Sequence, residues 1–557
     1  MQRKLPLPIG RTNYKQICDT AYYVDKTLLV KDILDDGAGV ILFTRPRRFG
    51  KTLNMDMLRT FFEKTDEDTG RYFEDKKIWE QGERYTCEQG KYPVVFLSLK
   101  DIKASDWDVA SAILKLIIRD EFSRHGELEN SNKVVATDIS FYKKIIGDTA
   151  TAADYMMSLR VLSRMLTAHY GVPAVIIIDE YDTPIQEGYL NSYYQQAVEF
   201  TRNFFSAAFK DNPHVALGVL TGILRVAKES IFSGLNNVRV YSVLSRRFCE
   251  YFGFTGAEVR AMAEYYNATD HIAELKEWYD GYQFGSTDIY NPWSVCNYFG
   301  NYCEAVPYWV QTSGNAVIRE ILVNASDTVN ESLRTLLNGH SLEYTIETNI
   351  IYPRIKDTQT NIFGFLLMTG YLKATAVTID EDGAYVCRLE IPNKEIKSIY
   401  RKEILALLTD NIGESTVDRL RVAILHKDAE GLKTALRKFM LETISYYDGL
   451  QESYYQGLLL GMSVLFERSY YPLSNRESGE GRYDLQLMPK TKDLPGIIIE
   501  IKAAREASEE QLKQLAQKAL MQIEEKHYDV ELKKQDISRI HKYGIAFCGK
   551  KVEIVVQ

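Results

Sequence analysis

The sequence lacks the features that mark secreted, zinc-binding and membrane-spanning proteins. Its seven cysteines are an odd number, lie far apart and include no Cys-x-x-Cys pair, which argues against a disulfide framework and against a zinc site. The first residues, Met1 to Pro6, contain no apolar run of the kind found in signal peptides, and no stretch approaches the roughly 20 apolar residues that a membrane span requires. We therefore expect a protein of the reducing cytoplasm that makes no membrane contact.

An excess of basic residues is also missing. The chain has 68 Lys and Arg against 76 Asp and Glu, a formal net charge of −8, so any contact with nucleic acid must come from local basic clusters. With 45% hydrophobic and 26% charged residues, the composition is that of a soluble globular protein. Its 557 residues exceed a single core, since domains hold roughly 100–200 residues each.

Residues 1–235 alternate short apolar runs with helical patterns, as expected of a parallel sheet covered by helices. Buried strands are expected in four aliphatic runs: 40–43, 94–98, 174–178 and 215–220. Helical periodicity is expected over three stretches: 53–62, 107–122 and 192–209.

The pattern then changes twice along the chain. Residues 236–440 are mainly helical and are interpreted as a lid or regulatory region. Within it, residues 361–373 followed by 384–391 resemble a helix that leads into a small hairpin, as in a winged-helix element. Residues 441–557 read as a complete small α/β domain. Its expected elements are helices at 453–466 and 508–526 and strands at 483–487, 496–501, 543–548 and 552–556.

A nucleotide-binding loop is indicated by Arg45-Pro-Arg-Arg-Phe-Gly-Lys-Thr52, which follows an apolar run and opens a helical pattern. Gly50, Lys51 and Thr52 supply the second half of GxxxxGK[ST], in which backbone N–H groups surround the phosphates, the lysine contacts the β and γ oxygens and the hydroxyl binds magnesium. Arg45 stands where this pattern has its first glycine, whose lack of a Cβ favours the tight turn. We expect ATP to bind here, with Arg45 and Arg48 as further phosphate-binding candidates. The alternative is a basic turn that caps a helix.

A second apolar run supports this site because it ends in two carboxylates, in Ala174-Val-Ile-Ile-Ile-Asp-Glu180. We expect Asp179 to hold the magnesium shell and Glu180 to polarise an attacking water. Thr221 ends the next apolar run, where it is placed to sense the γ-phosphate. Arg225 is a candidate for an arginine that acts in cis or across a subunit contact, which leaves a homo-oligomer open. The alternative for Thr221 and Arg225 is a cap or a surface charge.

A metal-dependent nuclease site is indicated near the other end of the chain. Asp484 and Glu500 lie on separate expected strands, and Lys502 lies two residues after Glu500, on the same strand face. Paired carboxylates bind divalent cations, and a neighbouring lysine can orient or help deprotonate the attacking water. The alternative is a salt-bridged pair at a sheet edge. Glu500 falls inside an apolar run, however, where an uncompensated carboxylate is costly, and this favours a functional reason.

Four further residues are candidates for accessory roles in the nuclease site. Glu452 is a candidate additional metal ligand, and Gln522 on the following helix is a candidate contact to the metal-bound water or the phosphate. Arg476 and Arg482 flank the loop before Asp484 and are candidate phosphate contacts, because a guanidinium binds phosphate bidentately.

The chain resembles a bacterial family that combines an AAA-ATPase-like N-terminal domain with a C-terminal PD-(D/E)xK nuclease domain. The matching landmarks cover nearly the whole length: Leu7-Pro-Ile-Gly10, Tyr23-Val-Asp-Lys-Thr27, the loop from Arg45 to Thr52, Ile178-Asp-Glu-Tyr-Asp182, Ser230-Ile-Phe-Ser-Gly-Leu-Asn236, Trp278-Tyr-Asp-Gly-Tyr282, and the segment from Ser474 to Asp484 with Glu500-Ile-Lys502. In this family, an arginine commonly occupies the position of the first glycine of the loop. The helix before the nuclease core often carries a Tyr-His pair where this chain has Tyr455-Gln456, which puts nuclease activity in question.

The resemblance implies a fold and a set of site residues. The fold is α/β, with a P-loop NTPase parallel sheet in residues 1–235, a helical middle region in 236–440 and a restriction-endonuclease-like α/β domain in 441–557. The implied ATPase residues are Lys51, Thr52, Asp179 and Glu180. The implied nuclease residues are Asp484, Glu500 and Lys502.

Three classes of function are compatible with these patterns. The favoured one is an ATP-dependent or ATP-gated nuclease that uses Mg²⁺, or Mn²⁺ at the nuclease site, and acts on DNA or RNA. By analogy alone, it would serve defence against phage or mobile-element biology. The alternative is a signalling or scaffold ATPase whose nuclease-like domain binds nucleic acid or protein without cleaving. An interaction protein with two degenerate sites is disfavoured, because the residues that decay first are intact.

Overall fold

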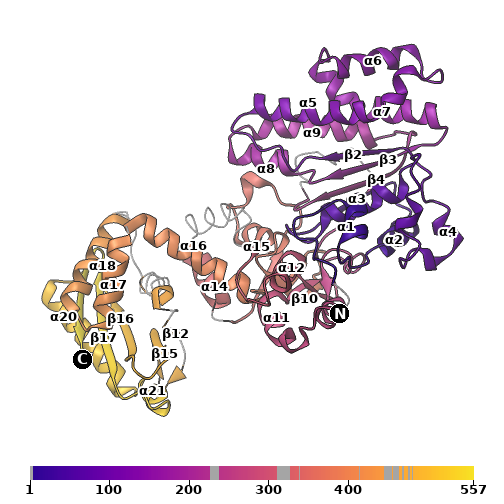
Figure 1. Cartoon of the computed structure of the whole chain (residues 1–557). Helices are drawn as coiled ribbons and strands as arrows, with labels where there is room; N and C mark the ends of the chain where they lie inside the picture. Colours follow the sequence, from indigo (N-terminus) through magenta and orange to yellow (C-terminus); the bar gives the residue numbers. More distant parts are fainter. Residues whose placement is uncertain are drawn as a thin grey trace. The chain divides into compact units, whose positions relative to one another are not determined.

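The computed structural model describes residues 4–225, 237–309, 327–337, 339–412, 414–443, 455, 463–466, 469–474, 477–478 and 481–557 (Figure 1). The chain divides into two compact units. The first comprises Met1–Trp309 with Glu343–Glu395, and the second comprises Val310–Leu342 with Ile396–Gln557. The three-part division drawn from the sequence at residues 235 and 440 stays a prediction.

The first unit is built on a five-stranded parallel sheet with the strand order β2-β3-β4-β1-β5. Its strands are β1 (Val40–Thr44), β2 (Val94–Ser98), β3 (Ala174–Asp179), β4 (Val215–Gly222) and β5 (Val238–Tyr241). The first four strands confirm the expected ones, because their aliphatic runs are almost wholly buried between helices. The sequence did not indicate β5, whose residues are half-buried or exposed at the edge of the sheet.

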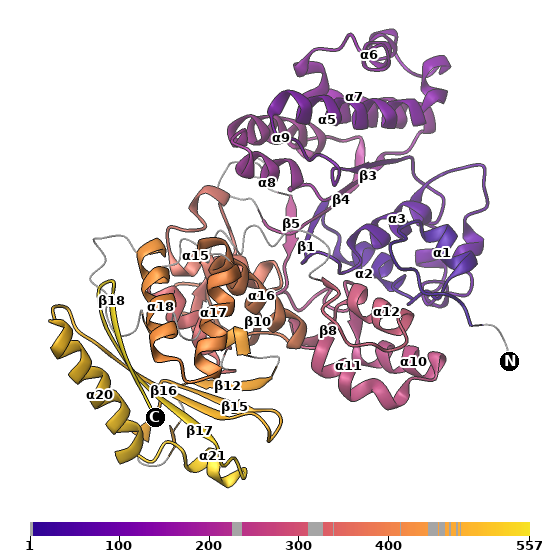
Figure 2. The same cartoon turned by 60° about the vertical axis from the view of Figure 1, so that its left-hand side comes forward.

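Helices cover both faces of this sheet (Figures 1 and 2). One face carries α5 (Trp107–Arg124), α7 (Ala152–Tyr170) and α9 (Tyr194–Phe209). The other face carries α1 (Tyr14–Thr20), α2 (Leu28–Asp36) and α3 (Lys51–Phe62). The remaining helices of this part are α4 (Glu83–Thr86), α6 (Ala136–Ile146) and α8 (Thr183–Leu190). The expected helices at 53–62, 107–122 and 192–209 are confirmed as α3, α5 and α9.

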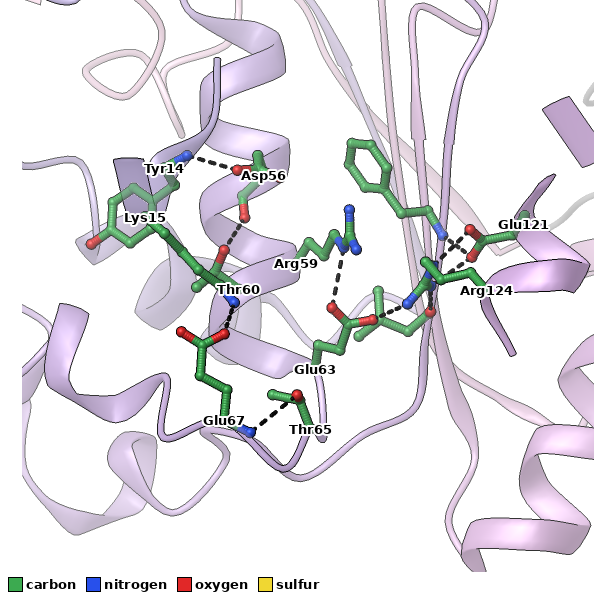
Figure 3. Close-up of polar contacts among 12 residues, drawn as sticks. Tyr14, Lys15, Asp56, Arg59, Thr60, Glu63, Thr65, Glu67, Glu121 and Arg124 are labelled. Carbon is green, nitrogen blue, oxygen red and sulfur yellow. Dashed lines mark hydrogen bonds and ion pairs between the residues drawn. The ribbon is translucent and has the colours of Figure 1, made fainter. Parts of the chain in front are cut away.

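A polar network fixes the C-terminal end of α3 to the sheet (Figure 3). Glu63, which caps this end, lies between Arg59, at 3.1 Å, and Arg124 of α5, with which it forms an ion pair. Arg124 also pairs with Glu121 at 2.7 Å, and Glu121 accepts a hydrogen bond from the backbone N–H of Phe96 in the edge strand β2. The network anchors α3, whose other end carries Lys51 and Thr52.

The rest of the first unit is a mixture of helices and small sheets. It contains α10 (Gly256–Tyr266), α11 (Ile272–Tyr279), α12 (Pro292–Gly300), and a sheet of β6 (Phe254–Thr255), β8 (Thr287–Tyr290) and β7 (Tyr282–Phe284). A helix followed by a hairpin is confirmed near the expected position, as α15 (Gln359–Met368) with β10 (Lys373–Ile379) and β11 (Tyr385–Glu390); β9 (Leu342–Ile346) joins their sheet. The winged-helix interpretation of this segment stays a prediction.

The second unit is built on a five-stranded mixed sheet with the order β12-β15-β16-β17-β18. Its strands are β12 (Tyr470–Ser474), β15 (Leu485–Pro489), β16 (Gly496–Ala503), β17 (Ile540–Cys548) and β18 (Lys551–Val556). Only β16 and β17 are parallel. The other described elements are α14 (Asp327–Leu337), α16 (Lys394–Ile412), which begins in the first unit, α21 (Val530–Lys534), and the short strands β13 (Glu477–Ser478) and β14 (Gly481–Arg482). Most of the helix expected at 453–466 lies outside the described residues.

The sheet of the second unit has α17 (Glu414–Leu425) and α18 (Ala429–Thr443) on one side and α20 (Glu509–Glu525) on the other (Figure 2), and alternate residues of β16 face different helices. Ile497, Ile499 and Ile501 belong to the core formed with α17 and α18. Ile498 belongs instead to the core formed with α20, which confirms the helix expected at 508–526. Because side chains alternate along a strand, Glu500 and Lys502 lie on the α20 face. Among the described residues, no helix is long and apolar enough to cross a membrane.

Candidate nucleotide site and candidate nuclease site

The loop between β1 and α3 has the geometry of an anion-binding turn. Gly50 caps the N-terminus of α3 in the left-handed conformation, with φ of 80°, which glycine adopts without a steric penalty. The helix that follows directs unpaired N–H groups and the positive end of its dipole towards the loop. Lys51 and Thr52 are the first two residues of this helix.

Lys51 is buried within the loop. Its Nζ donates hydrogen bonds to the carbonyl oxygens of Arg45, at 3.1 Å, and Pro46, at 3.0 Å, and lies 4.0 Å from Oε1 of Glu180. Burial lowers the pKa of Lys51, and the carboxylate of Glu180 opposes that shift. The ammonium group is thus held at the loop by weak neutral acceptors, which a phosphate can replace.

Asp179 brings together three residues that are far apart in sequence. It ends β3 and is fully buried; its Oδ2 accepts a hydrogen bond of 2.7 Å from Thr52 Oγ1, and its Oδ1 accepts one of 2.6 Å from Thr221 Oγ1. Burial raises the pKa of Asp179, and the nearby Glu180 carboxylate raises it further. A hydroxyl and a carboxylate side by side at a helix N-terminus form an oxygen ligand set that suits Mg²⁺. The residues therefore fit a magnesium–nucleotide complex.

Glu180 follows Asp179 in a strained backbone conformation. Its φ is 53°, which is uncommon for a residue other than glycine, and its N–H donates to Thr221 Oγ1 at 3.3 Å. Such strain is often found at functional sites, where it holds a side chain in one orientation. The carboxylate stays partly exposed beside Lys51.

Two neighbouring residues extend this site: Ser98, which was not expected there, and Asp182, which ends the family landmark that begins at Ile178. Ser98 ends β2, and its hydroxyl lies 3.5 Å from Oδ2 of Asp179; its place at the end of an expected strand was the signal available in the sequence. Asp182 is buried and accepts hydrogen bonds from the N–H groups of Ile223, at 2.8 Å, and Leu224, at 2.9 Å. Burial raises the pKa of Asp182 to about 6. Asp182 thereby holds the chain that leaves β4 against the start of α8.

The surroundings of Arg45 do not support the expected phosphate contact. The side chain is fully buried, with Nη1 donating to the carbonyls of Thr44, at 2.9 Å, and Tyr241, at 2.7 Å, and Nη2 donating to that of Phe248 at 3.0 Å. Its guanidinium also lies over the rings of Phe252 and Phe284. Arg45 therefore joins the loop to the end of β5 and the segment after it, and we assign it a structural role.

Arg48 and Arg225 occupy different surroundings. Arg48 is exposed, has a φ of 69°, and places its guanidinium 4.2 Å from the ring centroid of Trp293. Arg225 follows β4 and forms an isolated backbone bridge with Asn349. Its Nε is buried without a hydrogen-bond partner among the described residues. Both remain candidates for a nucleotide contact.

The second site lies where β15 and β16 meet on the α20 face. Asp484 comes directly before β15, and its Oδ2 accepts a hydrogen bond of 2.7 Å from the N–H of Ile501. Glu500 is buried in β16, and its Oε1 accepts hydrogen bonds from Lys502 Nζ, at 3.3 Å, and from Gln522 Nε2. The three expected nuclease residues are thus close together, with Gln522 beside them.

Glu500 is the electrostatic centre of this site. Burial, followed by the charge of Asp484, raises its pKa to about 8, and Lys502 counteracts this shift. Its Oε2 is buried and has no hydrogen-bond partner among the described residues. A divalent cation at this oxygen would supply the charge that the carboxylate lacks, so the two carboxylates fit such an ion.

Other expected members of the site cannot be placed. Glu452, Gln456 and Arg476 lie outside the described residues, as does the side chain of Arg482. No cluster of three or more His, Cys, Asp or Glu side chains arranged around a metal position occurs in the described part of the chain. Tyr528 was missed by sequence reasoning: its hydroxyl accepts a hydrogen bond of 3.1 Å from Gln522, and it lies in a turn without any motif.

Comparisons with known proteins identify the two domains in which these candidate sites lie. Residues 8–232 match the family described as Predicted AAA-ATPase, and residues 450–557 match the PD-(D/E)XK nuclease superfamily. A protein of Azotobacter chroococcum mcd 1, named "Uncharacterized protein in vnfD 5'region", is 26% identical over 514 residues, which cover 88% of each chain. The chain thus combines an AAA-ATPase-like domain at residues 8–232 with a PD-(D/E)XK nuclease superfamily domain at residues 450–557.

Proposed function

We propose that this protein binds and hydrolyses ATP at the first site and cleaves DNA or RNA with divalent metal at the second. The observation that carries the nuclease proposal is Glu500. It is a buried carboxylate with one oxygen bonded to Lys502 and Gln522 and the other without a partner among the described residues, next to Asp484. A sheet-edge salt bridge would leave both oxygens paired or solvated, because unpaired buried charge is destabilising.

In the ATPase site, Lys51 would exchange its two carbonyl acceptors for the β and γ phosphates of ATP. Thr52 and Asp179 would hold magnesium, and Thr221, bonded to the same carboxylate, would link this position to the end of β4. Bound magnesium neutralises charge on the phosphates. Glu180 would orient the attacking water and accept its proton.

In the nuclease site, Asp484 and Glu500 would hold the cation, Mg²⁺ or Mn²⁺, which polarises the scissile phosphate and lowers the pKa of a bound water. Lys502 would orient or help deprotonate that water and stabilise negative charge in the transition state. Gln522 would fix the orientation of Glu500 through its hydrogen bond to Oε1.

A reason to join the two activities in one chain is control. An ungated nuclease would endanger the nucleic acid of its own cell, so we propose that the nucleotide state governs cleavage, which requires that ATP bind two conformations unequally. A role in defence against phage or in mobile-element biology would suit such a gate.

The test uses purified full-length protein with supercoiled, linear and single-stranded DNA and with RNA, in Mg²⁺ or Mn²⁺, with and without ATP. Wild type should cleave at least one substrate in a metal-dependent manner, and Glu500→Gln should abolish cleavage. The matched control is Glu510→Gln, which changes an exposed residue on α20 and should cleave normally. Metal-independent binding of nucleic acid without cleavage would instead support a scaffold or signalling ATPase. If neither ATP nor the Lys51→Ala change alters the cleavage rate, control of cleavage by the nucleotide is refuted, but the nuclease proposal stands.

A further inference from the structure

A buried glutamine lies beside the candidate nuclease site without an explanation in the catalytic scheme. Gln486 is the second residue of β15 and comes two residues after Asp484, which directly precedes the strand. Its side chain is fully buried. Neither Oε1 nor Nε2 has a hydrogen-bond partner among the described residues.

The surroundings of Gln486 would suit an apolar residue better. Gln486 pairs with Leu473 of β12 on one side and with Ile498 of β16 on the other. Both neighbours belong to the apolar face that packs against α20. An amide buried there without partners is unfavourable, whereas leucine or methionine would bury the same volume at no such cost. The amide therefore has a use outside the packing of the sheet.

Oε2 of Glu500 also lacks a hydrogen-bond partner among the described residues. In the antiparallel pair of β15 and β16, Gln486 lies opposite Ile498, and Glu500 lies two residues further along on the same face. Such diagonal neighbours are about 7–8 Å apart at their Cα atoms, within reach of long side chains. Two buried polar groups, neither with a partner in the described part of the chain, are thus neighbours beside the carboxylate pair.

We propose that Gln486 is a positioning residue of the nuclease site, and this inference depends on the divalent-cation site proposed above. Its amide accepts a hydrogen bond from a water molecule of the cation held by Asp484 and Glu500. Residues that bind a metal through such outer contacts orient the ligands and tune the affinity of the site. Gln522 contacts the other oxygen of Glu500, since it donates to Oε1.

The test measures Mn²⁺ binding by the nucleotide-free full-length protein, with free Mn²⁺ followed by electron paramagnetic resonance. The binding component that disappears in Glu500→Ala is assigned to the nuclease site. Gln486→Leu should weaken that component by about 10- to 100-fold, the usual effect of losing an outer contact. Gln486→Met, closer in length to glutamine, is a second variant in case the leucine variant does not fold. The matched control, Gln514→Leu, changes an exposed residue of α20 and should bind Mn²⁺ normally.

A second readout separates this role from a purely structural one. Without metal, Gln486→Leu or Gln486→Met should raise the unfolding temperature, because the unpaired amide is removed. Stabilisation together with weakened Mn²⁺ binding supports the proposal. If either folded variant binds Mn²⁺ as tightly as wild type, the role of Gln486 is refuted while the metal site stands. If wild type has no component that Glu500→Ala removes, the metal site itself is refuted, and the role of Gln486 with it.

Discussion

Arg45→Gly would restore the glycine that usually begins a nucleotide-binding loop, yet the structure predicts that it will unfold the first unit more easily. Arg45 donates three hydrogen bonds to buried carbonyl groups, those of Thr44, Tyr241 and Phe248. Glycine would remove all three of these hydrogen bonds. The sequence pattern alone would predict that glycine is tolerated or favoured at position 45, whereas the observed contacts predict a loss of stability.

The magnitude follows from these contacts. A hydrogen bond to a charged group contributes about 1.5–3 kcal/mol. Two of the three bonds share Nη1, so the lower value applies to each, and the sum is about 4.5 kcal/mol. Loss of the contacts with Phe252 and Phe284 adds about 0.5–1 kcal/mol. Since a domain is stable by only about 5–15 kcal/mol, the loss should be a large part of the total.

The assay is urea unfolding followed by tryptophan fluorescence. All five tryptophans, Trp79, Trp107, Trp278, Trp293 and Trp309, belong to the first unit, so the signal reports on this unit alone. The matched control is Arg48→Gly in the same loop. This change removes the backbone strain of a positive φ, which stabilises the fold, and removes the contact with Trp293, which destabilises it. Each effect is about 1 kcal/mol, so the stability of Arg48→Gly should be close to that of the wild type. The structural role of Arg45 would be refuted if the two glycine variants were equally stable and only Arg45→Gly bound ATP more weakly. That result would instead support a contact between Arg45 and a phosphate.

Three further predictions concern the first unit. Lys51→Ala should weaken ATP binding at least roughly tenfold, about 1.4 kcal/mol, by calorimetric titration, and unchanged affinity would contradict the site. Glu180→Gln should keep ATP binding but slow hydrolysis on the order of 10²-fold, measured as phosphate release; normal turnover would place the base elsewhere. Glu395 is buried at the start of α16, where it accepts hydrogen bonds from Ser294 and from the N–H of Trp309, and burial raises its pKa to about 7. Because this pKa is raised, the folded state prefers the protonated acid. The contribution of Glu395 to stability should therefore be fully present below pH of about 4.5 and be lost, by on the order of 3 kcal/mol, as pH rises through about 7. Glu395→Gln is neutral at every pH and should lack this pH-dependent contribution to stability. If the variant and the wild type show the same pH profile of stability, measured by tryptophan fluorescence, the role of Glu395 is contradicted.

Some of the fold follows from sequence because burial leaves a clear pattern. β1, β3 and β4 are aliphatic runs between helices, and such runs indicate strands buried on both faces. β5 gave no such signal, since Val-Arg-Val-Tyr at a sheet edge is half-buried or exposed and resembles any short polar segment. The small sheets formed by β6 to β8 and by β9 to β11 consist of short strands of two to seven residues, and only the hairpin of β10 and β11 was anticipated.

The candidate sites divide in the same way. The meeting of Thr52, Asp179 and Thr221 could be anticipated, because parallel strands end at one edge of a sheet and bring their last residues together. The role of Arg45 could not, because two of its acceptors lie 196 and 203 residues away in regions without a motif. Gln486 was missed for another reason: a polar residue between two leucines reads as the exposed face of a strand, and only the packing of α20 shows that this face is covered.

The two carboxylates at the centres of the sites differ in how far the protein itself satisfies them. Both oxygens of Asp179 accept hydroxyl hydrogen bonds, whereas Glu500 keeps one buried oxygen without a partner among the described residues. A cation that binds only the folded state stabilises it in proportion to its affinity. Mg²⁺ alone should therefore stabilise the second unit, where a cation relieves an unpaired charge. The first unit should respond only to Mg²⁺ together with ATP, because both oxygens of Asp179 already accept hydrogen bonds and the phosphates of ATP supply further oxygen ligands for the ion. Because every tryptophan lies in the first unit, fluorescence should not detect the first effect, and circular dichroism should detect both.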